Sequence, residues 1–449
     1  MRDFILPKKV KQIINTIEEN GFEAYVVGGC VRDTLLGREP KDWDITTSAL
    51  PEDIMKIFPS VVPTGIQHGT VTVMLGKDGY EVTTYRVDGE YEDGRHPNEV
   101  IFTRDIVKDL ARRDFTINAM AYNPKVGLID IFGGQKDLKN KTIRCVGNPK
   151  TRFEEDYLRI MRAYRFATQL GFNIDFKTKC LITELCEESN NILSISKERI
   201  REELNKILLS SNNATSMGAN SFFFEKNLIG KILPELVECR SFRQNNPHHH
   251  LSLFGHTIWS VNLIESQLPL KLTMLLHDLG KLMTKTTDEK GISHYIGHAA
   301  VSKSIAERWL KEYKYDNKTI DKVLTLIEYH DSLSASRKSV KKLLSKIGEE
   351  NFRDLLKVRK ADILAQNPHY TYKKILELIR IEKLLNEVIS NKEPFSIKNL
   401  AINGNDVMSL GVPQGKVVGD ILSKCLEYVL ENPSKNNKED LIKYVDIVK

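Results

Sequence analysis

Two aspartates two positions apart are the first residues whose types and spacing suggest chemistry. Asp42 and Asp44 lie in the segment DWDITT, which the sequence predicts as a strand over 42–47. Alternate residues of a strand point to one face, so the two carboxylates would lie side by side. Neighbouring carboxylates repel unless a cation lies between them, and hard oxygen ligands suit Mg²⁺. The pair alone is equally typical of a solvated strand face.

A glycine pair ahead of these aspartates strengthens the metal-site interpretation. Gly28 and Gly29 follow a predicted strand over 24–27 and begin a predicted helix. Glycine lets backbone N–H groups approach a phosphate closely, and a helix N-terminus favours anions. Glu81, on a later predicted strand, is a candidate third carboxylate.

Asp156, Arg159 and Arg162 are spaced by three within a predicted helix over 151–170, so we expect them on one helix face. Arginine donates hydrogen bonds and aspartate accepts them. Together they could bind a ligand that offers a donor beside an acceptor. The alternative is a surface ion pair that contributes little.

A second group of candidate ligands lies in the later part of the chain. His277 and Asp278 stand in the apolar segment LTMLLHDLGK, where two adjacent polar side chains need a reason to be buried. One His-Asp pair is expected by chance among the 11 histidines, and His330-Asp331 is a second pair. The wider set of candidate ligands is His256, His277, Asp278, His298, His330 and Asp362. The sequence assigns no place to His248–His250 or His294.

The elements that must position these residues fall into two kinds. Up to about residue 147, an amphipathic helix with Val10, Ile13, Ile14 and Ile17 precedes short strands and helices, including paired strands at 71–75 and 80–86. After Pro149, helical patterns dominate; they cover 151–170, 176–188, 196–210, 256–266, 270–283, 298–312, 318–330, 338–346 and 350–365. The sequence therefore predicts an α+β chain whose mixed head is followed by all-α regions.

Bulk properties agree with a multidomain globular protein. The chain has 449 residues, too many for one small hydrophobic core. Of these, 41% are hydrophobic and 28% are charged. The formal net charge of +6 is compatible with a polyanionic partner without demanding one. The six scattered cysteines form no C-x-x-C pair, which predicts buried reduced thiols. Neither a membrane-spanning run nor a signal peptide is evident, so we expect a cytoplasmic protein with no membrane partner.

Three long motifs resemble one known family. GGCVRDTLLG with KDWDI, LARRDFTINAMAYN (110–123) and EEDYLRIMRAYRFATQLGF (154–172) are similar to the bacterial class of tRNA CCA-adding enzymes and poly(A) polymerases. The resemblance is strong over residues 20–210. It implies a polymerase-β-like nucleotidyltransferase head at 1–147, a helical neck at 148–245, a body at 246–365 and a tail at 366–449. It also implies addition of CCA to the 3′ end of tRNA from CTP and ATP, with release of pyrophosphate.

The resemblance implies roles for individual residues. Gly29 and Arg32 would contact the nucleotide's phosphates, and Asp42 and Asp44 would hold Mg²⁺ with support from Glu81. Further nucleotide contacts would come from Arg113, assisted by Asp114, and from Asp156, Arg159, Arg162 and Arg165. Among these, Asp156 and Arg159 match the motif that selects the base. Cytosine and adenine both present an exocyclic amine beside a ring-nitrogen acceptor, so one Asp/Arg pair can satisfy both bases. Uracil and guanine present a carbonyl and a ring N–H instead.

The histidine spacing resembles the HD metal-dependent phosphohydrolase superfamily. That resemblance implies an HD domain over 246–365 whose core ligands are His256, His277, Asp278 and Asp362, with His298 and His330 binding a second metal or the substrate's phosphate. Imidazole and carboxylate together suit a divalent transition metal. A 2′,3′-cyclic phosphate at a damaged tRNA end is the implied substrate. The alternative is a domain that only scaffolds tRNA.

Other activities remain open within the family. A poly(A) polymerase and a partial enzyme that adds only A are alternatives, while the loop DGEYEDGRHPN (88–98) favours CCA addition and is lacking in relatives that add only CC. A non-catalytic RNA-binding protein is disfavoured by the intact set Asp42, Asp44, Arg113, Asp156 and Arg159. The helical half is expected to contact the tRNA backbone, and 402–422 resembles the family's tail.

Overall fold

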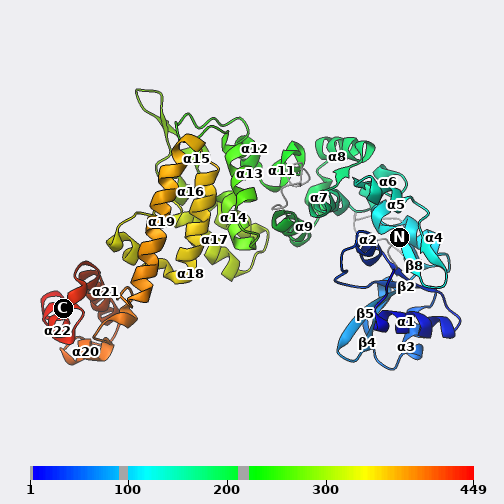
Figure 1. Cartoon of the computed structure of the whole chain (residues 1–449), viewed down its shortest axis with the longest axis horizontal. Helices are drawn as coiled ribbons and strands as arrows, with labels where there is room; N and C mark the ends of the chain where they lie inside the picture. The colour runs from blue at the N-terminus through cyan, green and yellow to red at the C-terminus, as the bar shows by residue number, and fades with distance from the viewer. Residues whose placement is uncertain (1–3, 90–99, 211–221) are drawn as a thin grey trace. The chain divides into compact units, whose positions relative to one another are not determined.

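A mixed seven-stranded sheet organises the N-terminal part of the computed structural model (Figure 1), which describes residues 4–89, 100–210 and 222–449. The strand order is β3-β4-β5-β2-β1-β8-β9. Strand β2 pairs parallel with β5, and the other neighbours pair antiparallel. The strands are β1 (Ala24–Val27), β2 (Ile45–Thr47), β3 (Val61–Gly65), β4 (Thr70–Leu75), β5 (Asp78–Thr84), β8 (Ala121–Asn123) and β9 (Gly127–Ile129).

The same part of the chain also contains helices, and the first of them confirms its predicted pattern. They are α1 (Lys8–Glu19), α2 (Gly29–Leu35), α3 (Pro51–Ile57), α4 (Ile106–Ala111), α5 (Gly134–Lys139), α6 (Pro149–Glu155), α7 (Leu158–Leu170), α8 (Phe176–Glu188), α9 (Lys197–Ser210) and α11 (Lys226–Ile232). The apolar stripe of α1, Val10, Ile13, Ile14 and Ile17, is fully buried. Short two-stranded ribbons pair β6 (Arg86–Asp88) with β7 (Val100–Phe102) and β10 (Thr142–Ile143) with β11 (Asn173–Ile174).

The turn at the glycine pair confirms the predicted strand-to-helix junction. Gly28 adopts φ +78°, which an L side chain rarely adopts, and Gly29 begins α2. A Cβ at Gly28 would lie 3.0 Å from the Arg113 guanidinium. Glycine therefore permits a close approach of this turn to a residue predicted to bind the nucleotide.

The predicted strand over 42–47 is wrong at its start. Strand β2 comprises only the buried residues Ile45–Thr47, and Asp42 and Asp44 precede it and are exposed. The backbone N–H of Val27 still donates to the Asp44 carbonyl at 3.0 Å, so the segment runs beside β1. The two carboxylates thus lie just before the first residue of β2, where their side chains reach solvent.

The predicted helix over 151–170 is also wrong, because it is interrupted. Asp156 lies between α6 and α7 with extended dihedrals, φ −151° and ψ 103°. Its Oδ1 accepts a hydrogen bond from the N–H of Leu158 at 3.0 Å. An aspartate that bonds a nearby backbone N–H competes with continuous helix, which accounts for the break. Asp156 and Arg159 therefore do not share the face of one helix.

The remainder of the chain is almost entirely helical. Its helices are α12 (Pro234–Glu238), α13 (Leu253–Leu263), α14 (Leu268–Leu276), α15 (Lys281–Thr284), α16 (His298–Glu312), α17 (Asn317–Tyr329), α18 (Arg337–Leu364), α19 (Pro368–Ser390), α20 (Gly404–Ser409), α21 (Lys416–Glu431) and α22 (Lys438–Val448). A short hairpin joins β12 (Thr286–Thr287) to β13 (Ser293–His294). Gly348, at φ +75°, breaks the regular dihedrals of α18, in agreement with the two helices predicted there.

The chain divides into two units, which we call the first unit (Met1–Ile232) and the second unit (Leu233–Lys449). The α+β class and the change to helices after the head are confirmed. The finer division at 147, 245 and 365 stays a prediction, and most of the loop 88–98 lies outside the described residues. Within the described ranges, no helix combines the length and the apolar character needed to cross a bilayer.

Gly280 tests how closely α15 and α16 are packed. A Cβ there would lie 2.3 Å from the His298 carbonyl oxygen and 2.6 Å from the Ser302 nitrogen, both backbone atoms. Gly280→Ala should therefore destabilise the protein by about 2 kcal/mol or more, since overpacking against backbone forces a helix to shift. Thermal unfolding followed by circular dichroism measures the effect. Gly419→Ala, which meets no atom within 4 Å, is the matched control and should be neutral or slightly stabilising.

Candidate functional site

Three predicted carboxylates line one cavity of the first unit. Asp42, Asp44 and Glu81 border a space of about 490 Å³, which we call the carboxylate cavity. Glu81 comes from β5, where it lies opposite Thr72 of β4. Among the described residues, no hydrogen bond or ion pair engages the carboxylate of Asp42 or Asp44. Lys41 also lines the cavity, without an ion pair to either aspartate. Converging acidic oxygens that no lysine or arginine engages in an ion pair fit a divalent metal ion.

A second cavity of the first unit is rich in arginine. It measures about 260 Å³, and we call it the arginine cavity; its lining is Arg112, Arg113, Asp114, Asp156, Leu158, Arg159, Arg162 and Arg199. The structure thus brings together four predicted nucleotide-binding residues, Arg113, Asp156, Arg159 and Arg162. Arg112 and Arg199 were not anticipated. Arg112 has a local signal, since it adjoins Arg113 in the RRD motif, whereas Arg199 has none.

Asp114 connects the glycine turn to the arginine cavity. Its Oδ2 accepts from the Arg162 Nε at 2.8 Å, and its Oδ1 accepts from the Asn118 amide at 3.1 Å. The Asn118 Oδ1 in turn accepts from Arg32 at 2.7 Å. Burial raises the pKa of Asp114, but Arg162 and Asn118 outweigh burial and lower it to about 2. The carboxylate is therefore ionised and orients both arginines.

Arg113 is held by a buried carboxylate as well. The Arg113 Nη2 lies 3.3 Å from the Oδ2 of Asp109, whose side chain is fully buried. Burial raises the pKa of Asp109, but Arg112 and Arg113 outweigh burial and lower it. Both arginines of the RRD motif thus share one anchor.

Arg165 is not placed in the arginine cavity. Its guanidinium donates to the buried Glu203 of α9 and lies 3.9 Å from the centroid of the Phe166 ring. These contacts join α7 to α9. The predicted contact of Arg165 with the nucleotide stays untested, while its structural contacts are clear.

The predicted ligands of the second unit converge on Asp278. Two groups have the spacing of a metal site and share this aspartate: His256, His277 and Asp278, and Asp278, His298 and His330. His256 and His277 place Nε2 at 3.4 and 3.3 Å from the Asp278 Oδ2. His298 and His330 place Nε2 at 3.4 and 3.7 Å from its Oδ1. Asp362 joins through its Oδ1, 3.1 Å from the His256 Nε2.

The orientation of the four imidazoles fits a cation between them. Each Nδ1 lies within hydrogen-bonding distance of a backbone carbonyl, those of Ala365, Met274, Tyr295 and Ile327. Donation from Nδ1 leaves the Nε2 lone pair facing inward, the arrangement typical of metal-bound histidine. The Nε2 atoms of His298 and His330 lie only 3.1 Å apart, and those of His256 and His277 are buried without a hydrogen-bond partner.

Protons compete with metal for these ligands. Burial lowers the pKa of His256, but Asp278 and Asp362 outweigh burial and raise it to about 9. Burial raises the pKa of Asp278, but His277 and Lys281 outweigh it and lower the pKa well below its usual range. A metal ion bound at the His256 Nε2 would therefore displace a proton.

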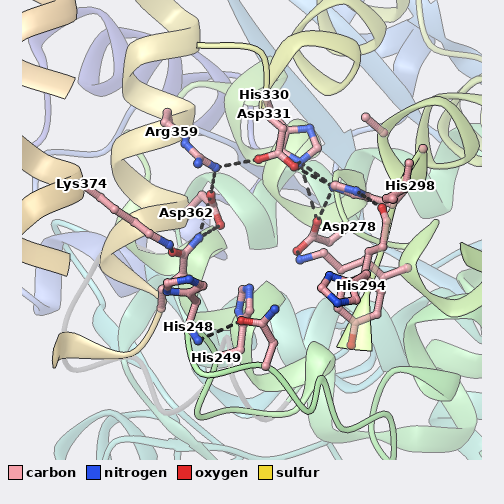
Figure 2. A pocket seen from close by; sticks show the side chains of 17 residues that line it. His248, His249, Asp278, His294, His298, His330, Asp331, Arg359, Asp362 and Lys374 are labelled. Atoms are coloured by element: carbon pink, nitrogen blue, oxygen red, sulfur yellow. Dashed lines mark hydrogen bonds and ion pairs between the residues drawn. The ribbon is translucent and has the colours of Figure 1, made fainter. Parts of the chain in front are cut away.

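A cavity of about 420 Å³, the histidine cavity, opens over this cluster. Figure 2 shows Arg359, Asp362 and Lys374 on one side, His298 and His294 on the other, and His248 with His249 below them. Sequence reasoning missed His248, His249 and His294 as lining residues, and it missed Arg359 and Lys374 as nearby cations. Arg359 has a helical signal, since it precedes Asp362 by three positions and donates to it at 2.7 Å.

The Asp114 network yields a pH-dependent stability prediction. Asp114→Asn should lower the free energy of unfolding at pH 7 by about 1–3 kcal/mol, because Arg162 loses a charged acceptor in a partly exposed pair. The folded-state pKa of about 2 lies below the ordinary 3.8, so the stabilisation is complete above pH 4 and is lost as pH falls toward 2. Urea unfolding at several pH values measures it. A wild-type advantage that persists at pH 2 would contradict the assignment, and Asp53→Asn is the surface control.

Comparisons with known proteins place the chain in a family. Residues 24–144 match the Poly A polymerase head domain, residues 171–238 the probable RNA and SrmB binding site of polymerase A, and residues 284–445 the tRNA nucleotidyltransferase domain 2 family. The CCA-adding enzyme of Lactobacillus helveticus is 34% identical over 442 residues, covering 98% of this chain and 96% of that protein.

Two further proteins agree over nearly the whole length. The CCA-adding enzyme of a Geobacillus species is 34% identical, covering 96% of this chain and 95% of its own. The crystal structure of the Bacillus stearothermophilus CCA-adding enzyme in complex with CTP superimposes with a TM-score of 0.71 at 28% identity, covering 98% of this chain and 97% of that one. This chain therefore belongs to the family of CCA-adding enzymes.

Proposed function

We propose that this protein adds CCA to the 3′ end of tRNA, taking CTP and ATP as substrates and releasing pyrophosphate. The observation that carries the proposal is the convergence of Asp42, Asp44 and Glu81 on one cavity. Membership of the CCA-adding family supports it. The cytoplasmic location expected from the sequence stays a prediction.

The chemistry is transfer of a nucleotidyl group. The terminal 3′-hydroxyl of the tRNA attacks the α-phosphate of the nucleotide, the new phosphodiester forms, and the bond to pyrophosphate breaks. Bound Mg²⁺ would activate the hydroxyl and neutralise the leaving group. Asp42 and Asp44 hold that ion in our proposal, and Glu81 supports them.

The protein's own groups then position the nucleotide. The backbone at Gly29 and the Arg32 guanidinium bind phosphate oxygens, as a helix N-terminus favours. Arg113 and Arg162, each fixed by a buried aspartate, add positive charge beside them. Their prior orientation means that little reorganisation is needed when charge develops.

Asp156 and Arg159 select the base in this proposal. Asp156 accepts from the exocyclic amine of cytosine or adenine, and Arg159 donates to the adjacent ring nitrogen. Uracil and guanine would present a carbonyl to the aspartate and an N–H to the arginine. Mismatched polar groups in a closed site can reduce kcat/KM for the wrong base by roughly 10⁴-fold.

Removal of either metal-binding carboxylate tests the proposal. Asp42→Ala or Asp44→Ala should lower nucleotide addition by about 10³-fold or more and leave tRNA binding nearly unchanged, because the ion acts in the transition state. Incorporation of labelled CTP into tRNA lacking CCA measures the rate, and a filter-binding assay measures affinity. Asp53→Ala, a partly exposed aspartate outside the cavity, is the control. Wild-type rates in both cavity variants would refute the assignment.

We propose a second activity for the second unit, hydrolysis of a phosphate ester at a bound transition metal. The observation that favours it is the pair of ligand groups that share Asp278. A bound metal would lower the pKa of a water so that hydroxide attacks phosphorus. His256, His277, Asp278 and Asp362 hold the first ion in this proposal, and His298 with His330 the second. A cyclic phosphate at a damaged tRNA end is the proposed substrate.

Metal content and metal-dependent hydrolysis distinguish an HD hydrolase from a scaffold. The purified protein should contain a transition metal and, with added Mn²⁺ or Ni²⁺, hydrolyse a 2′,3′-cyclic phosphate. Asp278→Asn should lose both the metal and hydrolysis, because it removes the charge shared by both ligand groups. Elemental analysis and product chromatography measure these results. His369→Gln, an exposed histidine, is the control. No metal and no turnover in protein that still adds CCA would reduce the domain to a scaffold.

A further inference from the structure

Arg199 of α9 contacts the base-selecting carboxylate directly. Its Nη2 lies 2.7 Å from the Oδ2 of Asp156, and both residues line the arginine cavity. The other oxygen of Asp156 accepts from the N–H of Leu158 at 3.0 Å. Each carboxylate oxygen therefore has one donor from the protein and retains acceptor capacity for a ligand.

The contact matters because little else holds Asp156. The residue lies in the break between α6 and α7, so no continuous helix sets the direction of its side chain. Among the described residues, Arg199 forms the ion pair with its carboxylate. Without that contact, only the hydrogen bond from the Leu158 N–H to Oδ1 would hold the carboxylate, and its direction would be less fixed.

Arg199 also has unused hydrogen-bonding capacity. Its Nη1 is buried and lacks a hydrogen-bond partner in the described part of the chain. A buried donor without a partner is costly. Such a group at the wall of a cavity is positioned to donate to a polar ligand.

Arg159 is held by different groups. Its Nη1 donates to the Arg152 carbonyl at 2.8 Å and to Glu155, and its Nη2 donates to the Arg112 carbonyl at 3.2 Å. The arginine of the selecting pair is thus fixed by backbone and by α6, whereas the aspartate depends on α9. Arg199 is the residue of α9 that contacts the Asp156–Arg159 pair, through its ion pair with Asp156.

We propose that Arg199 is a positioning residue that determines base specificity by fixing the direction of the Asp156 carboxylate. This inference rests on the proposed function. A fixed carboxylate meets the exocyclic amine of cytosine or adenine. A carboxylate held at one oxygen alone can shift to accept from the ring N–H of uracil or guanine, so the loss of Arg199 relaxes selection against those two bases.

The test compares single-nucleotide addition by Arg199→Ala, Arg199→Lys and wild type, with CTP and UTP offered separately to tRNA lacking CCA. The ratio of kcat/KM for CTP to that for UTP should fall at least about 10-fold in Arg199→Ala, since one lost polar constraint is worth a factor of this order. Arg199→Lys keeps one charged donor and should recover part of the ratio. Arg201→Ala, an arginine of the same helix outside the cavity lining, should keep the wild-type ratio.

The ratio separates positioning from a merely structural role, because a damaged fold lowers both rates together. Adding Arg199→Ala to Asp156→Ala should cause little further loss of selectivity if Arg199 acts through Asp156. Selectivity that is unchanged in Arg199→Ala, or losses that add independently, would overturn the inference. Failure of every form, including wild type, to add CTP would instead refute the proposed function on which it rests.

Discussion

Carboxylates that converge require positive charge, and this constraint shapes both units of the protein. The first unit pairs its buried aspartates with arginine: Asp109 with Arg112 and Arg113, and Asp114 with Arg162. Asp42 and Asp44, by contrast, have no ion-pair partner among the described residues, although Lys41 lines the same cavity. A protein that must exchange metal and nucleotide in each cycle benefits from leaving that place open.

The second unit meets the same constraint in another way. Asp278 is almost completely buried, and four imidazoles surround it. Their backbone contacts orient them with one nitrogen inward, where it can bind a metal ion or, as at His256, a proton. Arg359 and Lys281 lie at the edge of the cluster and bond Asp362 and Asp278. The two proposed activities are chemically compatible, because hydrolysis of a cyclic phosphate supplies the free 3′-hydroxyl that nucleotide addition needs.

Sequence patterns predict this molecule well wherever the cause is local. The spacing of Val10, Ile13, Ile14 and Ile17 predicts α1, and the glycine pair predicts the turn into α2. The break at Asp156 escaped prediction because one side-chain-to-backbone bond outweighed a strong helical pattern. Sequence patterns do not predict the role of Arg199, because that role depends on how α9 packs against α7. Likewise, His248 and His249 line the histidine cavity only because the fold places them beside residues that are distant in the sequence.

The most direct measurement is nucleotide addition to two tRNA substrates, one that lacks CCA and one that already ends in CC, with CTP and ATP supplied singly and together. The account predicts two cytidines from CTP alone on the first substrate, one adenosine from ATP on the second, and a completed CCA end from the mixture. Repeated addition of adenosine to either substrate would identify a poly(A) polymerase. Addition of adenosine to the CC end with no use of CTP would identify an A-adding enzyme, and either result would contradict the central claim.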